Sequence, residues 1–335
     1  EAGFSPVSIS GFSSVVVNAN LRSVNVLGTI DADHATYQPL TATSGRLTDL
    51  MLDTTLDVIN VRSLTVNGVA GSDSLVVRGT AGNDNFTTIS DTSVQIAGLL
   101  GVTLANIGAG DAIRAEGGAG NDLFVVPTGN LADVTVDGGG PAGVDTLQMN
   151  DTAFNVIAGS SADAGRVNTT NFTGIENLTL NSAGVGVATI NGTGGADSVS
   201  VNGGAGGGTI STSFGPAITL QGFAATSLLN LVTGAGADSI QVRQAANWEF
   251  DTVAIDGGDP WVGDSVAVIG TENDEQLAYT GTSENAGTLA LTSGTTTTYN
   301  LVNVSSLLVD AKGAAGDSLN VTNANAMIQH GFTPG

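Results

Sequence analysis

The sequence is organised by a short unit that recurs along the chain: a glycine-rich turn, one acidic residue and a short strand-like segment. The clearest copy is the stretch 117–126, which reads GGAGNDLFVV. In the other clear copies, the second and fourth residues after the acid are apolar. The acids of those copies are Asp73, Asp145, Asp197, Asp238, Asp264 and Asp317. Apolar residues at every second position predict a β-strand with one buried face, so the chain is predicted to be a series of short strands joined by glycine turns.

The turns themselves need glycine because they require positive φ angles and a close approach of backbone segments, which a Cβ atom opposes. The acid at the end of each turn has two possible roles. Its carboxylate can accept hydrogen bonds from neighbouring backbone N–H groups, or it can bind a cation. The residues alone leave both roles open.

Composition limits the kind of body these units can build. The chain has 335 residues, of which 41% are hydrophobic and only 4% aromatic, so it can fold and its core must consist of small aliphatic side chains. Stacked repeats share one continuous core. We therefore predict an all-β fold, specifically a right-handed parallel β-solenoid with irregular coils. The alternative is a string of small β-sandwich domains, and parallel stacking of the strands that follow the acids distinguishes the two.

The glycine turns resemble a known family. The stretch 117–125 fits the nonapeptide G-G-x-G-x-D-x-U-x of RTX proteins, and the stretch 79–87 fits it with Thr80 in place of a glycine. The chain is also similar to long, acidic, repetitive bacterial surface proteins that carry diverged forms of this unit. The resemblance implies a parallel β-roll with Ca²⁺ bound between the turns of successive coils. This chain departs from the family because most copies stand alone rather than in unbroken tandem.

Ca²⁺ takes six to eight oxygen ligands, so one turn supplies about half of them and a neighbouring coil must supply the rest. The resemblance implies the following candidate ligands: Asp84, Asp122, Asp73, Asp145, Asp197 and Asp238. The alternative for these acids is that they only bind N–H groups of the turns.

The distribution of the turns suggests three segments. Residues 1–60 carry few glycine–acid turns and are predicted to form an N-terminal cap or docking segment of short strands. Residues 61–321 are predicted to be the repetitive solenoid body, and residues 322–335 a polar C-terminal tail. Within these segments, His34–Arg46 and Gly206–Gly208 are predicted to be loops. The chain starts at Glu1 rather than methionine, which suggests a processed chain or a segment of a longer one.

Charge excludes several classes of partner. The net charge is −23 with eight basic residues, which argues against binding to nucleic acid or to anionic membranes. No apolar run reaches the roughly 20 residues needed to span a bilayer. The chain has no cysteine, so neither disulfides nor thiolate–metal sites contribute to its stability.

Two functional alternatives were weighed against a structural role. An enzyme that cleaves acidic polysaccharides on a β-helix needs clustered carboxylates beside arginine or lysine. Here the single lysine, Lys312, and the seven arginines are widely spread, and His34 and His330 lie in no motif. We therefore predict no enzymatic activity. Trp248 and Trp261 lie among acids and could form a sugar-binding platform of an adhesin module, although such tryptophans more often pack within a fold or at an interface.

The sequence thus predicts a non-catalytic, extracellular structural or adhesive protein. It would be a subunit or segment of a cell-surface or fibrous assembly, with calcium bound at its turns. The partner expected first is the chain itself, because the open strand edges of a solenoid can pair head to tail or laterally. Surface polysaccharide is the second expected partner.

Overall fold

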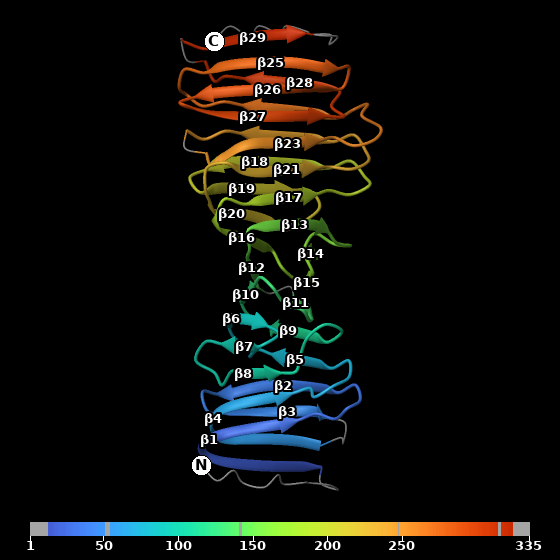
Figure 1. Cartoon of the computed structure of the whole chain (residues 1–335), viewed down its shortest axis with the longest axis vertical. Helices are drawn as coiled ribbons and strands as arrows, with labels where there is room; N and C mark the ends of the chain where they lie inside the picture. Colours follow the sequence, from blue (N-terminus) through green and yellow to red (C-terminus); the bar gives the residue numbers. More distant parts are fainter. Residues whose placement is uncertain (1–12, 51–53, 141–142, 247, 314–315, 324–335) are drawn as a thin grey trace. The chain divides into compact units, whose positions relative to one another are not determined.

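The computed structural model describes residues 13–50, 54–140, 143–246, 248–313 and 316–323. None of these residues lies in a helix, and the strands form mixed β-sheet that is open rather than closed (Figure 1). The predicted all-β class is therefore confirmed. The chain divides into two compact units, Glu1–Asp145 and Thr146–Gly335, and each is described by itself.

The first unit contains eleven strands among its described residues. They are β1 (Ser14–Leu27), β2 (His34–Thr41), β3 (Ser44–Leu50), β4 (Thr54–Asn67), β5 (Ser74–Arg78), β6 (Asn85–Ser90), β7 (Ser93–Ile96), β8 (Val102–Ala105), β9 (Ala112–Gly118), β10 (Leu123–Pro127) and β11 (Asp133–Gly139).

The second unit contains the remaining described strands. They are β12 (Thr146–Asn150), β13 (Ala153–Ala158), β14 (Gly165–Val167), β15 (Thr170–Thr173), β16 (Asn177–Gly184), β17 (Val187–Asn191), β18 (Ser198–Gly204), β19 (Gly207–Thr212), β20 (Ala217–Phe223), β21 (Ser227–Val232), β22 (Ser239–Arg243), β23 (Phe250–Asp256), β24 (Ser265–Ile269), β25 (Gln276–Ser283), β26 (Ala286–Ser293), β27 (Thr295–Val302), β28 (Ser306–Asp310) and β29 (Ser318–Asn323).

Strands that follow an acidic turn pair in parallel with one another. In the first unit, β5 lies between β2 and β9, with Ser74 opposite both His34 and Ala112. In the second unit, β22 lies between β18 and β24, with Ile240 opposite Val199 and Val266. Because parallel partners share one register, the inward apolar positions of successive strands stack directly.

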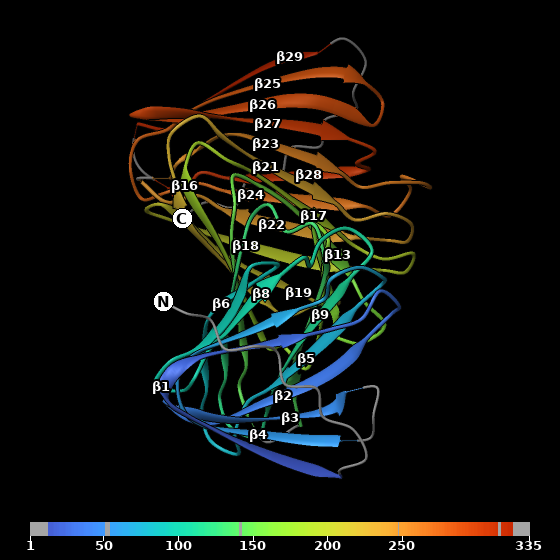
Figure 2. The same cartoon turned by 60° about the horizontal axis from the view of Figure 1, so that its bottom comes forward.

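Antiparallel hairpins are inserted between these parallel strands. β2, β3 and β4 form one such meander, and β25, β26 and β27 form another. Figure 2 shows β21, β23, β27, β26, β25 and β29 one after another along the second unit. Two acids of successive turns that are joined by a hydrogen bond lie 38 to 42 residues apart in the sequence where a hairpin is inserted between them. They lie 23 or 26 residues apart where no hairpin is inserted. This difference explains why the acids are irregularly spaced in the sequence.

Two segments predicted to be loops are mostly strand, and only a short turn remains in each, at residues 42–43 and 205–206. The segment His34–Arg46 forms β2 and the start of β3, because Ala35, Tyr37 and Pro39 alternate as buried residues with Thr36 also enclosed. The glycines 206–208 lie at the β18–β19 hairpin, and Gly207 and Gly208 belong to β19. In both places, glycine or proline favoured the prediction of a loop where strand residues are found.

The core is built mainly from aliphatic side chains, as the composition predicts. Val58, Leu64 and Ile113 are fully enclosed. A stacked pair of rings, Phe86 and Phe124, joins β6 to β10 with centroids 4.8 Å apart. The aromatic residues are thus few but contribute to contacts between paired strands.

The two predicted segment boundaries, near residues 60 and 322, both fall within strands. Residue 60 lies inside β4, where Asn60 has a φ of 53°. Residues 322 and 323 end β29, and the rest of the predicted tail lies outside the described residues.

Candidate functional site

The acid that ends a glycine turn folds back over its own turn. In the turn before β6, the Thr80 N–H donates to Oδ2 of Asp84 at 2.6 Å, and the Thr80 hydroxyl donates to the same oxygen at 3.1 Å. In the turn before β18, the Thr193 N–H donates to Oδ2 of Asp197 at 2.6 Å. Such local bonds from backbone to carboxylate stabilise a turn in the way that Asx-turns do.

The other carboxylate oxygen links one turn to the next. The Asp84 N–H donates to Oδ1 of Asp122 at 2.7 Å, and the Asp122 N–H donates to Oδ1 of Asp145 at 2.7 Å. We call each such row an acid column. The four columns are Asp33, Asp73, Asp111; Asp84, Asp122, Asp145; Asp197, Asp238, Asp264; and Glu275, Asp317.

Several column members are deeply buried and incompletely hydrogen-bonded. Asp122 and Asp145 are each 2% exposed. One oxygen lacks a hydrogen-bond partner in each of five described acids: Asp73, Asp122, Asp238, Asp264 and Glu275. An ionised oxygen that is buried without a donor costs free energy, so the columns combine favourable hydrogen bonds with an electrostatic cost.

This electrostatic cost is reflected in raised pKa values of two column members, Asp122 and Asp264. Burial, with a smaller contribution from the charges of Asp145 and Asp84, raises the pKa of Asp122 to about 6 against the opposing hydrogen bond from the Asp84 N–H. Burial also raises the pKa of Asp264. Asp122 and Asp264 therefore hold a proton more tightly than an exposed aspartate does.

The first glycine of a turn is required by space. A Cβ atom on Gly68 would lie 2.2 Å from Oδ2 of Asp73, and one on Gly117 would lie 2.2 Å from Oδ2 of Asp122. Positive φ, which the sequence analysis expected, applies to later glycines of the turn such as Gly120, with a φ of 127°. The carboxylate therefore occupies the place of the missing side chain.

The structure brings the six predicted site residues together only in part. Asp84, Asp122 and Asp145 share one column, Asp197 and Asp238 share another, and Asp73 belongs to a third. Five column members were not among the predicted ligands. Asp111, Asp264 and Asp317 head copies of the repeated unit, whereas two members were missed altogether.

The missed members are Asp33 and Glu275. Gly28 precedes Asp33 by five residues, and Gly270 precedes Glu275 by five residues, as Gly79 precedes Asp84. This spacing could have identified both. The neighbouring Asp274 is exposed, and its Oδ1 accepts a hydrogen bond from the Gly316 N–H at 3.1 Å.

The carboxylates of the columns face backbone N–H donors rather than one another. Among the described residues, no three acidic or histidine side chains converge as metal ligands. Ca²⁺ needs carboxylate and carbonyl oxygens directed at one point, whereas the Oδ1 atoms of the column accept backbone N–H groups from the preceding turn. The donors in these turns point towards the carboxylate, which is the arrangement of an anion site rather than a cation site.

Acids and arginines do meet on the outer face of β5, β9 and β11. Glu116 accepts hydrogen bonds from Arg78 at 2.9 Å and from Arg114 at 2.8 Å, and Arg114 also pairs with Asp137. Partial burial opposes ionisation of Glu116, but the two arginines lower its pKa below the ordinary value. The cluster forms ion pairs that join the neighbouring strands β5, β9 and β11.

The two tryptophans differ in exposure. Trp248 is 5% exposed, its Nε1–H donates to the Gly207 carbonyl at 2.7 Å, and its ring meets Phe250 edge-on at 5.6 Å. Trp261 is half-buried. Trp248 thus serves packing rather than an exposed sugar-binding platform.

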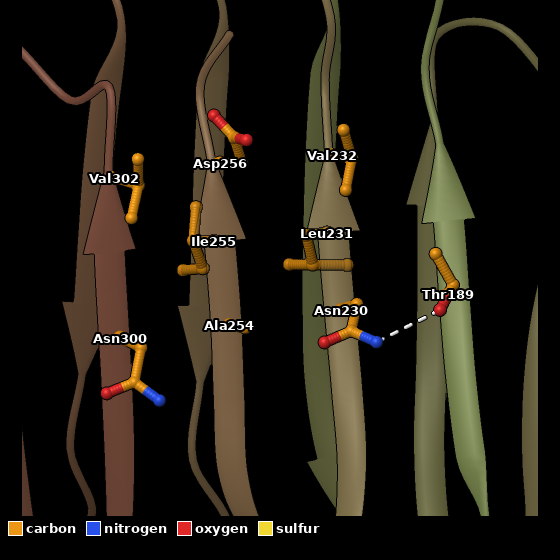
Figure 3. Close-up of a pocket in the computed structure, with 9 residues that line it drawn as sticks. All are labelled: Thr189, Asn230, Leu231, Val232, Ala254, Ile255, Asp256, Asn300 and Val302. Atoms are coloured by element: carbon orange, nitrogen blue, oxygen red, sulfur yellow. Dashed lines mark hydrogen bonds between the residues drawn. The ribbon is translucent and has the colours of Figure 1, made fainter.

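A shallow groove of about 310 Å³ lies over β17, β21, β23 and β27 (Figure 3). Its outward-facing residues include the polar Thr189, Asn230 and Asn300 and the apolar Val232 and Val302. The amide of Asn230 donates to the Thr189 hydroxyl at 3.0 Å. The one carboxylate in the lining, Asp256, already accepts from the Gly258 N–H at 3.0 Å. The surface of the groove is therefore mainly apolar, with a few amide and hydroxyl groups, and one carboxylate stands in its lining.

Comparison with known proteins gives no family assignment: no protein-family model matches the chain, and no curated protein matches it. A search of the described residues for a long apolar helix that could cross a bilayer finds none.

Proposed function

We propose that the chain is a non-catalytic structural or adhesive protein that works outside the cell, as a subunit or segment of a cell-surface or fibrous assembly. Its body would be a right-handed parallel β-solenoid with coils of two lengths. The mechanism is mechanical: stacked strands present a rigid, acidic surface.

The observation that carries this proposal is the parallel register of the acid-headed strands. The turn of Asp73 stacks on turns 40 residues before and 38 residues after it, and an acid-to-backbone bond joins each step. Apolar residues of adjacent coils then form continuous layers, as in repeat proteins. A string of sandwich domains does not call for such bonds between successive turns.

Self-association is supported by the terminal strands. Among the described pairings, β1 pairs with β4 and β29 pairs with β25. Large apolar side chains are exposed on both terminal strands, including Val16 at 60% and Leu319 at 51%. An unpaired strand edge is a template for another strand, and a repeated head-to-tail contact that does not close makes a fibre.

The experiment is to follow the size of the purified chain by sedimentation velocity and negative-stain electron microscopy from micromolar to millimolar concentration. We expect linear polymers, and we expect Val16→Lys or Leu319→Lys to shorten them because charge on an edge strand blocks pairing. Leu131→Lys, at a residue that is exposed outside any strand, is the matched control. A monomer at every concentration would overturn the assembly. Labelling of the chain by a membrane-impermeant reagent in lysed cells but not in intact cells would overturn the surface location.

A further inference from the structure

What holds the acidic turns in place is a separate matter from the proposed surface role, and the answer does not depend on that role. The chain has many more acids than bases, and its turns resemble turns that bind calcium. The described geometry allows a direct answer in the column of Asp197, Asp238 and Asp264.

The first step is the occupancy of the carboxylate oxygens. Oδ1 of Asp238 accepts the Asp197 N–H at 2.7 Å, and Oδ1 of Asp264 accepts the Asp238 N–H at 2.8 Å. These lengths are those of charge-assisted hydrogen bonds. Each bond joins turns that are 41 or 26 residues apart in the chain, so every carboxylate fixes the position of the preceding coil.

The second step is the surroundings of the other oxygen. The Oδ2 atoms of Asp238 and Asp264 are enclosed and have no hydrogen-bond partner. In the turn of Asp197, Oδ2 accepts the Thr193 N–H at 2.6 Å, and Oδ1 accepts the Thr193 hydroxyl at 2.9 Å. Donors that point at a carboxylate oppose a cation beside it, and Ca²⁺ needs six to eight oxygen ligands directed at one point.

From these two steps we infer that the acid columns replace calcium. Each carboxylate binds the backbone N–H of the preceding acid in its column, and the turns are stable without a bound cation. Asp238 is then a positioning residue for the turn of Asp197. The role needs an oxygen acceptor at Oδ1, and it does not need a negative charge. Asparagine can therefore fill the position, whereas alanine cannot.

The test uses the full chain and two readouts. Calcium is titrated by calorimetry into chelator-treated protein, and thermal melting is compared in millimolar Ca²⁺ and in excess chelator. Amide hydrogen exchange is then measured at Asp197 in Asp238→Asn and Asp238→Ala. Glu284→Ala, which removes one exposed charge at the β25–β26 hairpin, is the control.

We expect no heat of calcium binding, no change of melting midpoint and an unchanged Asp197 amide in Asp238→Asn and in the control. In Asp238→Ala the same amide should exchange at least about tenfold faster because it has lost its acceptor. Calcium binding with a rise of several degrees in the midpoint, or loss of calcium response in Asp238→Asn, would overturn the inference. If Asp238→Ala does not fold, the inference is decided by the calcium calorimetry and by the hydrogen exchange of the Asp197 amide in Asp238→Asn. Neither result depends on whether the chain assembles at a surface.

Discussion

Replacing Asp122 by asparagine should stabilise the first unit at neutral pH. Asparagine keeps an oxygen that can accept the Asp84 N–H, which now bonds to Oδ1 of Asp122 at 2.7 Å. It removes a charge whose other oxygen is buried without a partner. The substitution therefore imitates the neutral form of the acid in a place where the ionised form is costly.

The pKa of Asp122 gives the size and the pH range of the effect. It is raised from 3.8 to about 6 in the folded chain, and each unit corresponds to about 1.4 kcal/mol. The folded state binds this proton more tightly, so the free energy of unfolding falls as pH rises from about 4 to about 6 and is level above that. Asp122→Asn should thus gain up to about 3 kcal/mol at pH 7 and lose most of this advantage near pH 4.

The assay is urea unfolding at several pH values, followed by hydrogen exchange of peptides from β6 and β10 so that the first unit is read separately. Asp122→Ala should be less stable than the wild type by about 1–3 kcal/mol, because the Asp84 N–H loses its acceptor. Asp133→Asn makes the same charge change at an exposed residue and should be neutral. The reasoning is refuted if Asp122→Asn is as destabilised as Asp122→Ala, or if its pH dependence matches that of the wild type.

Two further predictions concern the packing of the turns and the core. Gly68→Ala should destabilise the first unit by about 1–3 kcal/mol in urea unfolding, because its methyl group would overlap the carboxylate of Asp73. Gly108→Ala has open space around the new methyl group and should be tolerated; equal losses in both variants would contradict the steric argument. Phe124→Ala should cost about 3–5 kcal/mol by removing the fully buried partner of Phe86, and a loss below about 1 kcal/mol would show that β10 is not packed as described.

The strands could be predicted from the sequence because their apolar residues follow a strict period of two. Val199 and Val201, or Ile240 and Val242, alternate with polar residues and are buried as expected. The hairpins were harder to predict. In β2, Pro39 and the polar neighbours of Tyr37 suggested a loop, but antiparallel pairing with β3 stabilises the segment. That pairing depends on contacts beyond the local sequence, and local propensity does not encode it.

The candidate site shows the same division between local and long-range information. The position of the acid after a glycine turn is a local property, and the sequence identified Asp84 and Asp122. Their partnership is not local, because 38 residues separate them and the inserted hairpin sets that distance. Glu275 was missed because its longer side chain departs from the aspartate pattern, although it occupies the same buried place.

The columns and a calcium site differ most clearly in the sign of their response to acid. Protons compete with calcium for carboxylate ligands, so acidification weakens a calcium-bound turn. In the columns the proton relieves a buried charge, as the raised pKa values of Asp122 and Asp264 indicate, so mild acid should strengthen the same turn. The ion pairs of Arg46, Arg78 and Arg114 do not involve column members, so these pairs do not neutralise the buried acids. Insensitivity to chelator together with stabilisation by mild acid would therefore identify a hydrogen-bonded column, and the opposite pair of responses would identify calcium.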